Sequence, residues 1–230
     1  MRWRWLSATF SGCNTPTLAA IPENRCKTMI CDFHTHHIGR RPAILSTRSA
    51  AANEYTSLEY HPWNLPETYS PLPATAENLS NFTALGEIGL DRLRGPAIEV
   101  QKQYLIALLQ LASDCNKPVI FHCVRTFPEL FALLKNFSLP WAIHGFRGKA
   151  DLLEEIWARG GIVSLHPSIA NNLQLLEKLA SPQGKIAFET DDDAALDLET
   201  IVDTAMSRSG NADLQKIAND TFMEFISYGK

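Results

Sequence analysis

A cluster of histidines follows the first apolar segment of the chain that resembles a β-strand. Asp32, His34 and His36 occupy alternate positions there. Alternate side chains of a strand point to the same face, so both imidazoles would lie side by side, about 6–7 Å apart along the strand. Imidazoles in this arrangement can bind one metal ion. A single pair of this kind is also typical of ordinary histidines, so the prediction of a metal site depends on further ligands elsewhere.

Further ionisable residues stand at the ends of other apolar segments. They are Glu87 and Asp91, His122, His144, and Glu189 and Asp191. The carboxyl ends of parallel barrel strands meet at one face, where catalytic groups gather. Burying one such group unpaired is costly, whereas a cation can compensate several of them together. The sequence therefore predicts a metal centre at this face.

Short apolar runs and helical patterns alternate along most of the chain. The runs expected to form strands are Ile30–His36, Ala43–Thr47, Ser57–His61, Thr83–Leu90, Pro118–Cys123, Trp141–Gly145, Gly161–His166 and Lys185–Thr190. The segments expected to form helices are Ile98–Ser113, Thr126–Asn136, Lys149–Arg159, Ala194–Ser207 and Leu214–Ile226. Nearly continuous apolar runs are typical of strands buried on both faces of a parallel sheet.

This alternation predicts an α/β fold, a (β/α)₈ TIM-type barrel. The segments between the first three strands are too short for ordinary helices, so we expect the first one or two crossover helices to be shortened or missing. No linker divides residues 29–230, which we expect to form a single barrel domain. Residues 1–28 are expected to be an N-terminal extension outside the fold.

Composition excludes several classes of protein. The chain has 230 residues, 45% of them hydrophobic, and a net charge of −4. It is therefore not disordered or collagen-like, and it lacks a run of about 18 apolar residues that would span a membrane. Its five cysteines include no C-x-x-C pair, which favours a reducing, cytoplasmic location. We expect a monomer with no membrane partner.

The motifs together resemble one known family. The patterns D-x-H-x-H, G-E-I-G-L-D-x-x-R, P-V-I-x-H-C-x-R, H-x-F-x-G and E-T-D occur in family order between Met29 and about Phe222. This chain is similar to the TatD family of metal-dependent hydrolases and deoxyribonucleases. PHP-type phosphoesterases begin with a similar histidine strand, but Gly86–Asp91 and Glu189–Asp191 favour the TatD family.

The resemblance implies a site with two metal ions. His34, His36 and Asp191 would hold one ion, His122 and His144 would hold the other, and Glu87 would bridge the two. Glu87 and Asp191 would be the catalytic carboxylates, with Asp191 accepting a proton from the attacking water. Such a ligand set suits Zn, Mn, Fe or Ni, and less commonly Mg. Two cations about 3.5–4 Å apart can lower the pKa of a shared water and neutralise a phosphoryl oxygen.

The positions of the arginines favour a phosphate substrate. Seven of them follow predicted strands, namely Arg40, Arg41, Arg48, Arg92, Arg94, Arg125 and Arg147. One guanidinium group can bind two oxygens of a phosphate at once, through two hydrogen bonds. The predicted substrate-binding residues are His61, Trp63, Arg94, Arg125 and Arg147. The leading hypothesis is a phosphodiesterase acting on DNA as a 3′–5′ exonuclease, or on a small phosphoester.

Two alternatives remain open at this point. A metal-dependent amide or lactone hydrolase would need the same centre without the phosphate contacts. A catalytically silent metal-binding protein would keep the fold and bind metal without catalysing a reaction. Asp192 and Asp193 stand where the family usually has a small residue and proline, and their charges would repel a phosphate backbone unless they are paired.

Overall fold

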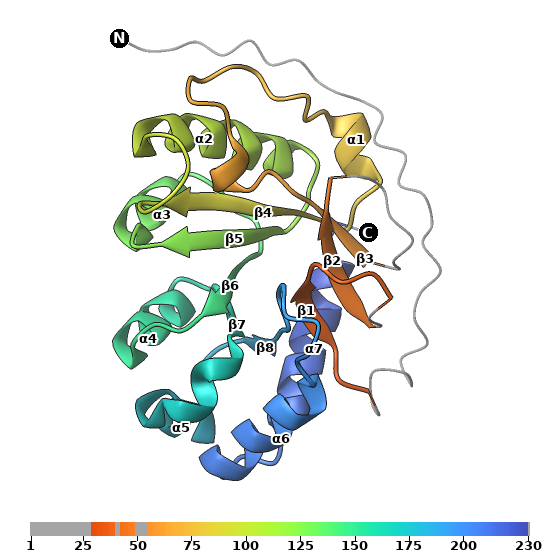
Figure 1. The fold of residues 1–230 in the computed structure, drawn as a ribbon, viewed down its shortest axis with the longest axis vertical. Helices are drawn as coiled ribbons and strands as arrows, with labels where there is room; N and C mark the ends of the chain where they lie inside the picture. The colour runs from red at the N-terminus through yellow and green to blue at the C-terminus, as the bar shows by residue number, and fades with distance from the viewer. Residues whose placement is uncertain (1–28, 40–41, 49–54, 230) are drawn as a thin grey trace.

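The computed structural model describes residues 29–39, 42–48 and 55–229. The extension predicted for residues 1–28 lies outside this part, as do Arg40 and Arg41. Eight strands form a closed barrel in which every neighbouring pair is parallel (Figure 1). They are β1 (Asp32–Thr35), β2 (Ala43–Thr47), β3 (Tyr55–Leu58), β4 (Ala84–Asp91), β5 (Val119–Val124), β6 (Trp141–Phe146), β7 (Ile162–Leu165) and β8 (Ile186–Phe188). The predicted barrel is thus confirmed.

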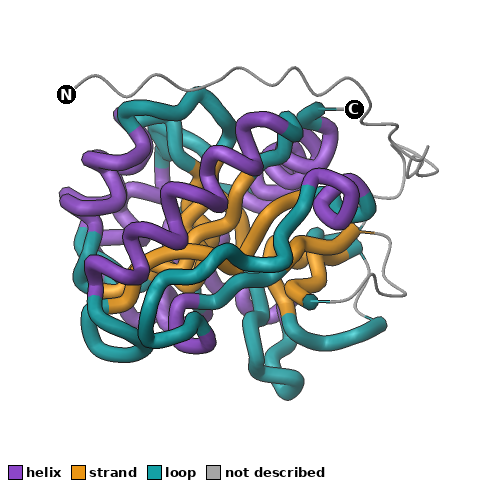
Figure 2. Tube along the Cα trace, turned by 90° about the horizontal axis from the view of Figure 1, so that it is seen from above, coloured by secondary structure: helices purple, strands orange, loops and turns teal. Residues whose placement is uncertain are grey.

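Helices surround the barrel, as the tube view of Figure 2 shows. They are α1 (Ala76–Ser80), α2 (Ile98–Asp114), α3 (Phe127–Leu134), α4 (Ala150–Ala158), α5 (Leu173–Ala180), α6 (Leu198–Ser209) and α7 (Leu214–Ser227). Two short 3-10 helices, η1 (Pro62–Asn64) and η2 (Pro167–Asn171), follow β3 and β7. No helix of the described residues is long and apolar enough to cross a membrane.

The apolar pattern accounts for this arrangement. All eight residues of β4 are buried, as expected for a strand covered on both faces. Leu105 and Leu109 of α2 pack in the same cluster as Leu85 and Ile88 of β4. Burial of such side chains, at about 25 cal/mol per Å² of apolar surface, holds the outer helices against the strands.

The first third of the barrel differs from the rest. In the ranges that the structure describes, the connections between β1, β2 and β3 contain no helix, in agreement with the expected loss of the first crossover helices. The C-terminal helix α7 does not replace them but closes one end of the barrel, because its Phe222 and Phe225 pack in one cluster with a residue from each of the eight strands. Phe33 of β1 lies 6.4 Å from Phe222 and 4.9 Å from Phe225 between ring centroids, and Tyr55 of β3 lies 5.7 Å from Phe222.

The sequence did not predict α1 or α5, and it placed the start of α6 too early. The Asn172 side chain caps α5 by accepting a hydrogen bond from the Leu175 amide at 3.2 Å. Helix α6 begins at Leu198 rather than at Ala194, because Asp197 supplies the cap through the Glu199 amide. Caps of this kind decide where short helices begin, and apolar spacing alone does not show them.

Candidate metal centre

Six predicted metal ligands meet at the carboxyl end of the barrel. His34 belongs to β1 and His36 follows it, while Glu87 belongs to β4. The other three come from the second half of the chain, His122 from β5, His144 from β6, and Asp191 from the segment after β8. Residues separated by more than 150 positions in the sequence therefore share one site.

Glu87 lies at the centre of this group, and its two oxygens face different histidines. Oε2 lies 3.2 Å from Nε2 of His34 and 3.2 Å from Nε2 of His36. Oε1 lies 3.2 Å from Nδ1 of His122 and 2.6 Å from Nε2 of His144. A single carboxylate thus separates two pairs of imidazoles.

Asp191 joins the first pair. Its Oδ1 lies 3.6 Å from Nε2 of His34 and 3.7 Å from Nε2 of His36. The main chain fixes this position, because the Asp191 amide donates to the His34 carbonyl at 3.0 Å and the His36 amide donates to the Asp191 carbonyl at 3.0 Å. Asp191 adopts a φ of 53°, which is uncommon for a residue other than glycine and is frequent at functional sites.

Two carboxylates orient the imidazoles of the second pair. Nε2 of His122 donates to Oδ2 of Asp91 at 3.0 Å, and Nδ1 of His144 lies 3.4 Å from Oε1 of Glu189. The other ring nitrogen of each histidine faces Glu87, at 3.2 Å for Nδ1 of His122 and 2.6 Å for Nε2 of His144. Carboxylates in this position fix the tautomer of metal-binding histidines and make them more basic.

Burial and charge act against each other on these groups. Burial alone would raise the pKa of Glu87, but the imidazoles of His144, His34 and His122 hold it well below its usual value. Burial alone would lower the pKa of His144, but Glu87 and Glu189 raise it well above its ordinary value. The hydrogen bond with Glu87 raises the pKa of His36 despite partial burial. Without a metal ion, the site attracts protons to its histidines.

The donor set fits divalent transition metals. Nε2 of His34 is buried and has no hydrogen-bond partner among the described residues, although it points at two carboxylates. Buried polar atoms without partners are rare in proteins and call for an explanation such as a missing ion. Potential ligand atoms gather in two groups, and within each group they all lie within 4.8 Å of one another. One group is formed by His34, Glu87, His144 and Asp191, and the other by His61, Glu87 and His122.

His61 lies close to this centre but differs from the other histidines. Its Nε2 is 3.3 Å from Oε1 of Glu87, while its Nδ1 accepts a hydrogen bond from the Trp63 amide at 3.1 Å. A neutral imidazole that accepts at Nδ1 carries its proton on Nε2. His61 is therefore suited to donate a hydrogen bond into the site rather than to bind a metal ion.

Trp63 and Arg94 form the rim of the site on the same side. The indole Nε1 of Trp63 donates to Oδ2 of Asp91 at 2.6 Å. The guanidinium of Arg94 stacks over the Trp63 ring, 3.7 Å from its centroid. The stack leaves Trp63 40% exposed, next to the rings of His61 and His122.

The arginines near the site differ in how free they are. Arg48 lies 3.6 Å from Glu59, and Arg92 pairs with Glu129 and donates to the Arg125 carbonyl. Arg125 is exposed, with a φ of 55°. In the part of the chain that the structure describes, the Arg147 side chain has no hydrogen bond or ion pair. Only some of the predicted positive charge is thus available to a substrate.

Sequence reasoning named two carboxylates, Asp32 and Glu189, but did not predict that they hold the site together. Asp32 does not join His34 and His36, since it accepts hydrogen bonds from the Thr190 amide at 3.1 Å and hydroxyl at 2.7 Å. Glu189 is fully buried and accepts a hydrogen bond from the Gly145 amide at 2.5 Å. Asp32 begins the motif D-x-H, and Glu189 begins the motif E-T-D. A carboxylate inside an apolar run was the signal in the sequence that could have indicated such a buried role.

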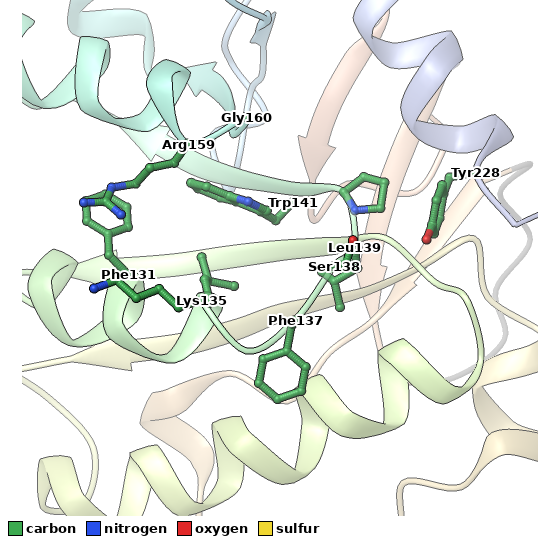
Figure 3. Close-up of a pocket in the computed structure, with 11 residues that line it drawn as sticks. Phe131, Lys135, Phe137, Ser138, Leu139, Trp141, Arg159, Gly160 and Tyr228 are labelled. Carbon is green, nitrogen blue, oxygen red and sulfur yellow. The ribbon is translucent and has the colours of Figure 1, made fainter.

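A cavity of about 560 Å³ lies at the other end of the barrel (Figure 3). Phe131, Trp141 and Tyr228 line it, together with Lys135 and Arg159. Its lining holds no histidine, cysteine or carboxylate, so it offers neither metal ligands nor a general base. The chemistry therefore belongs to the metal centre.

Comparison with known proteins identifies the family. The family model for TatD-related DNases matches residues 16–205. This chain belongs to the TatD-related DNase family. The match begins inside the segment expected to lie outside the fold, so the domain boundary at residue 29 stays a prediction.

Curated relatives of the family resemble parts of the chain. A 3′-5′ ssDNA/RNA exonuclease TatD from Pantoea vagans is 32% identical over 146 residues, or 57% of this chain and 55% of that protein. The protein of the same name from Escherichia coli K12 is 34% identical over 116 residues, or 47% and 45%. An uncharacterized metal-dependent hydrolase from Methanocaldococcus jannaschii is 26% identical over 117 residues, or 49% and 46%. The chain thus spans about half the length of the curated relatives it matches.

Solved structures support the fold. The crystal structure of YJJV, a TatD homologue from Escherichia coli K12, matches with a TM-score of 0.66 and 22% identity, covering 87% of this chain and 98% of that one. A TatD family hydrolase from Entamoeba histolytica matches with a TM-score of 0.52 and 18% identity, covering 65% and 64%.

Proposed function

We propose that this protein is a metal-dependent phosphodiesterase with two divalent cations, acting on DNA from its 3′ end or on a small phosphoester. The observation that carries the proposal is the position of Glu87, whose two oxygens face separate pairs of histidines. Zn, Mn, Fe, Ni and Mg are the candidate ions. Family relatives named as 3′-5′ ssDNA/RNA exonucleases support the choice of a phosphodiester substrate.

In this proposal, His34, His36 and Asp191 would hold one cation, His122 and His144 would hold the other, and Glu87 would serve both. When bound, the pair of cations would acidify water and neutralise charge on a phosphoryl oxygen. The protein supplies the geometry, because Asp91 and Glu189 keep the imidazoles turned toward Glu87.

Asp191 is the proposed proton acceptor. Its side chain is 23% exposed, whereas the Glu87 side chain is 3% exposed. A proton taken up by Asp191 can therefore pass to solvent, which the buried Glu87 cannot reach. The backbone hydrogen bonds to His34 and His36 hold the Asp191 carboxylate in place for this step.

The substrate contacts are proposed for His61, Trp63, Arg94, Arg125 and Arg147. Nε2–H of His61 points into the site and suits a phosphoryl oxygen. Arg94 and Trp63 stack on one rim, and Arg147 stands free on another side. Together they place positive charge and an aromatic surface around a centre built from histidines and carboxylates.

We also propose a monomeric enzyme located in the cytoplasm. Cys123, in the part of the chain that the structure describes, forms no disulfide, which suits a reducing compartment. Burial raises the pKa of the Cys123 thiol to about 12, so it stays protonated and serves packing rather than catalysis. Light scattering of the purified protein tests the oligomeric state.

One observation favours a second candidate, an amide or lactone hydrolase. Asp192 is exposed next to Asp191 and has no ion pair among the described residues, so its charge opposes an approaching phosphate. A neutral amide or lactone would not meet this repulsion.

Activity of the purified full-length protein distinguishes the two candidates. The protein is loaded in turn with each candidate metal and given a 3′-labelled single-stranded oligonucleotide, bis(p-nitrophenyl) phosphate, and an amide and lactone panel. We expect phosphodiester cleavage, and we expect Glu87→Gln to lower it more than about 100-fold, because even residues that only orient ligands cost 10–100-fold when changed. Cleavage of the panel alone, or equal rates for wild type and Glu87→Gln, would contradict the proposal.

A further inference from the structure

A second hollow opens at the carboxyl end of the barrel, beyond β6 and β7. It has a volume of about 380 Å³ and lies between Arg147, in the loop after β6, and the segment formed by η2 and the start of α5. The polar side chains on the opposite wall are Ser168, Asn171, Asn172 and Gln174. This volume lies within the range of 300–1,000 Å³ that is usual for small-ligand pockets. We call this hollow the β6–β7 cleft.

The β6–β7 cleft borders the metal centre. Arg147 stands three positions after the ligand His144, and the His166 amide donates to the Phe146 carbonyl at 3.1 Å, which ties the two loops together. Nδ1 of His166 accepts from the Ser168 amide at 3.0 Å, which joins His166 to the segment on the opposite wall of the cleft. The cleft and the metal centre therefore share β6 and the loop that follows it, with His144 on the strand and Arg147 in the loop.

The side chains of the cleft are available to a ligand. Arg147 is exposed and, within the described ranges, has no ion pair, in contrast to Arg48 and Arg92. The side chains of Asn171 and Gln174 are exposed and likewise form no hydrogen bond to another described residue. A cation opposite two free amides matches the charge and hydrogen-bonding groups of a nucleotide.

We propose that the β6–β7 cleft binds the nucleotide adjacent to the scissile phosphate of a single strand. Arg147 pairs with the next phosphate, and Asn171 and Gln174 form hydrogen bonds with the base or sugar. A single strand is required, because the edges of its bases are free for such hydrogen bonds. This inference rests on the proposed phosphodiesterase function and adds a preference for oligonucleotides over small diesters.

The first test compares two substrates in the metal-loaded enzyme. KM and kcat are measured for a single-stranded tetranucleotide and for bis(p-nitrophenyl) phosphate, which has no second nucleotide. We expect Arg147→Gln to raise the oligonucleotide KM about 10- to 100-fold, the ratio typical of a lost hydrogen bond to a charged group. The effect on the small diester should be much smaller. Arg159→Gln, at the other end of the barrel, is the matched control and should change neither.

A binding measurement separates this inference from the proposed function. Fluorescence anisotropy with a labelled tetranucleotide, in the presence of Ca²⁺, which is not among the candidate catalytic ions, needs no turnover. Arg147→Gln should weaken binding and reduce the slope of log K against log salt by about 0.7, since one phosphate contact is lost. Gln174→Ala should weaken binding less, with the salt slope unchanged.

The outcomes have distinct meanings. Equal losses on both substrates would overturn the inference, because Arg147 would then act on the metal centre itself. Unchanged binding and KM in Arg147→Gln would overturn it as well. Failure of the wild type to cleave any phosphodiester, combined with weaker binding by Arg147→Gln, would overturn the proposed function and leave the cleft assignment supported.

Discussion

The carboxylate of Asp91 accepts four hydrogen bonds, and they come from both the metal centre and its rim. Oδ2 accepts from Nε2 of His122 at 3.0 Å and from Nε1 of Trp63 at 2.6 Å. Oδ1 accepts from the amides of Leu93 at 2.7 Å and Arg94 at 3.2 Å. Burial would raise the pKa of Asp91, but the hydrogen bonds from His122 and Trp63 outweigh it and lower the pKa. The ionised carboxylate thus couples a metal ligand to the loop that carries Arg94.

Asp91→Asn should weaken metal binding about 10–100-fold, the usual cost of losing a carboxylate that orients a ligand. The amide replaces one acceptor oxygen by a donor, so either His122 or the Leu93–Arg94 loop loses its partner. Isothermal titration with Mn²⁺ measures the change. Asp203→Asn, on the exposed face of α6, is the control. Equal metal affinity in Asp91→Asn and wild type would show that Asp91 does not orient His122.

At the scale of single residues, sequence motifs identified the six converging side chains but not their orientation. The motifs supply residue types at strand ends, and parallel strands bring those ends together. Which imidazole nitrogen faces Glu87 depends on Asp91 and Glu189, and the sequence pattern does not specify those contacts. For the same reason His61 was grouped with the substrate contacts, although it reaches Glu87 itself at 3.3 Å.

Among the elements, β4 pairs with β5 through two glycines of positive φ, 156° at Gly86 and 149° at Gly89. A Cβ on Gly89 would lie 1.9 Å from the carbonyl oxygen of His122, and a Cβ on Gly86 would lie 2.7 Å from Ile120. Gly89 pairs with His122 in the sheet. The absence of a side chain at these two positions therefore brings Glu87 next to its histidine neighbour on β5.

Gly89→Ala should destabilise the fold by about 3 kcal/mol or more, at the upper end of the cost of overpacking, because backbone atoms rather than a flexible side chain must move. It should also weaken metal binding by displacing His122. Urea unfolding of the metal-free protein measures the first effect. Gly160→Ala, with a positive φ of 78° but no atom within 4 Å of the new Cβ, is the matched control and should cost only about 1–2 kcal/mol. A similar cost for both variants would refute the steric explanation.

The elements themselves were largely predictable. Eight apolar runs correspond to the eight strands, because strands buried on both faces need apolar residues throughout. The short helices α1 and α5 were missed, since five to eight residues give too little periodicity to recognise. The position of α7 across one end of the barrel was also not predicted, because a helical pattern does not show what the helix packs against.

For the molecule as a whole, metal binding and pH should be linked. In the metal-free protein the pKa of His144 is raised above its ordinary value of 6.5, since Glu87 and Glu189 outweigh burial. The protonated imidazole therefore stabilises the fold fully below about pH 6.5, and this contribution is lost as the pH rises through the raised pKa. The lowered pKa of Glu87 acts oppositely, since its contribution is present above its ordinary value of 4.5 and lost as the pH falls through the lowered pKa.

Cations compete with protons for the same nitrogens, so the stabilisation by metal should grow with pH. We expect the difference in Tm between metal-loaded and metal-free protein to widen from pH 6 to pH 8. Calorimetry with and without Mn²⁺ at fixed concentration measures it. The same difference at both pH values would contradict the assignment of His144 as a protonated group that metal displaces.

The packing of α7 against β1 has a consequence for how the protein is made. The Cys31 amide donates to Oδ1 of Asn219 at 3.0 Å, and Phe33 is covered by Phe222 and Phe225, so the first strand is completed by the last helix. While the ribosome is still synthesising the chain, β1 has emerged long before these partners exist. Its apolar side chains stay uncovered during that interval, which exposes the nascent chain to aggregation. We expect the binding of chaperones to the growing polypeptide to end only after α7 has left the exit tunnel.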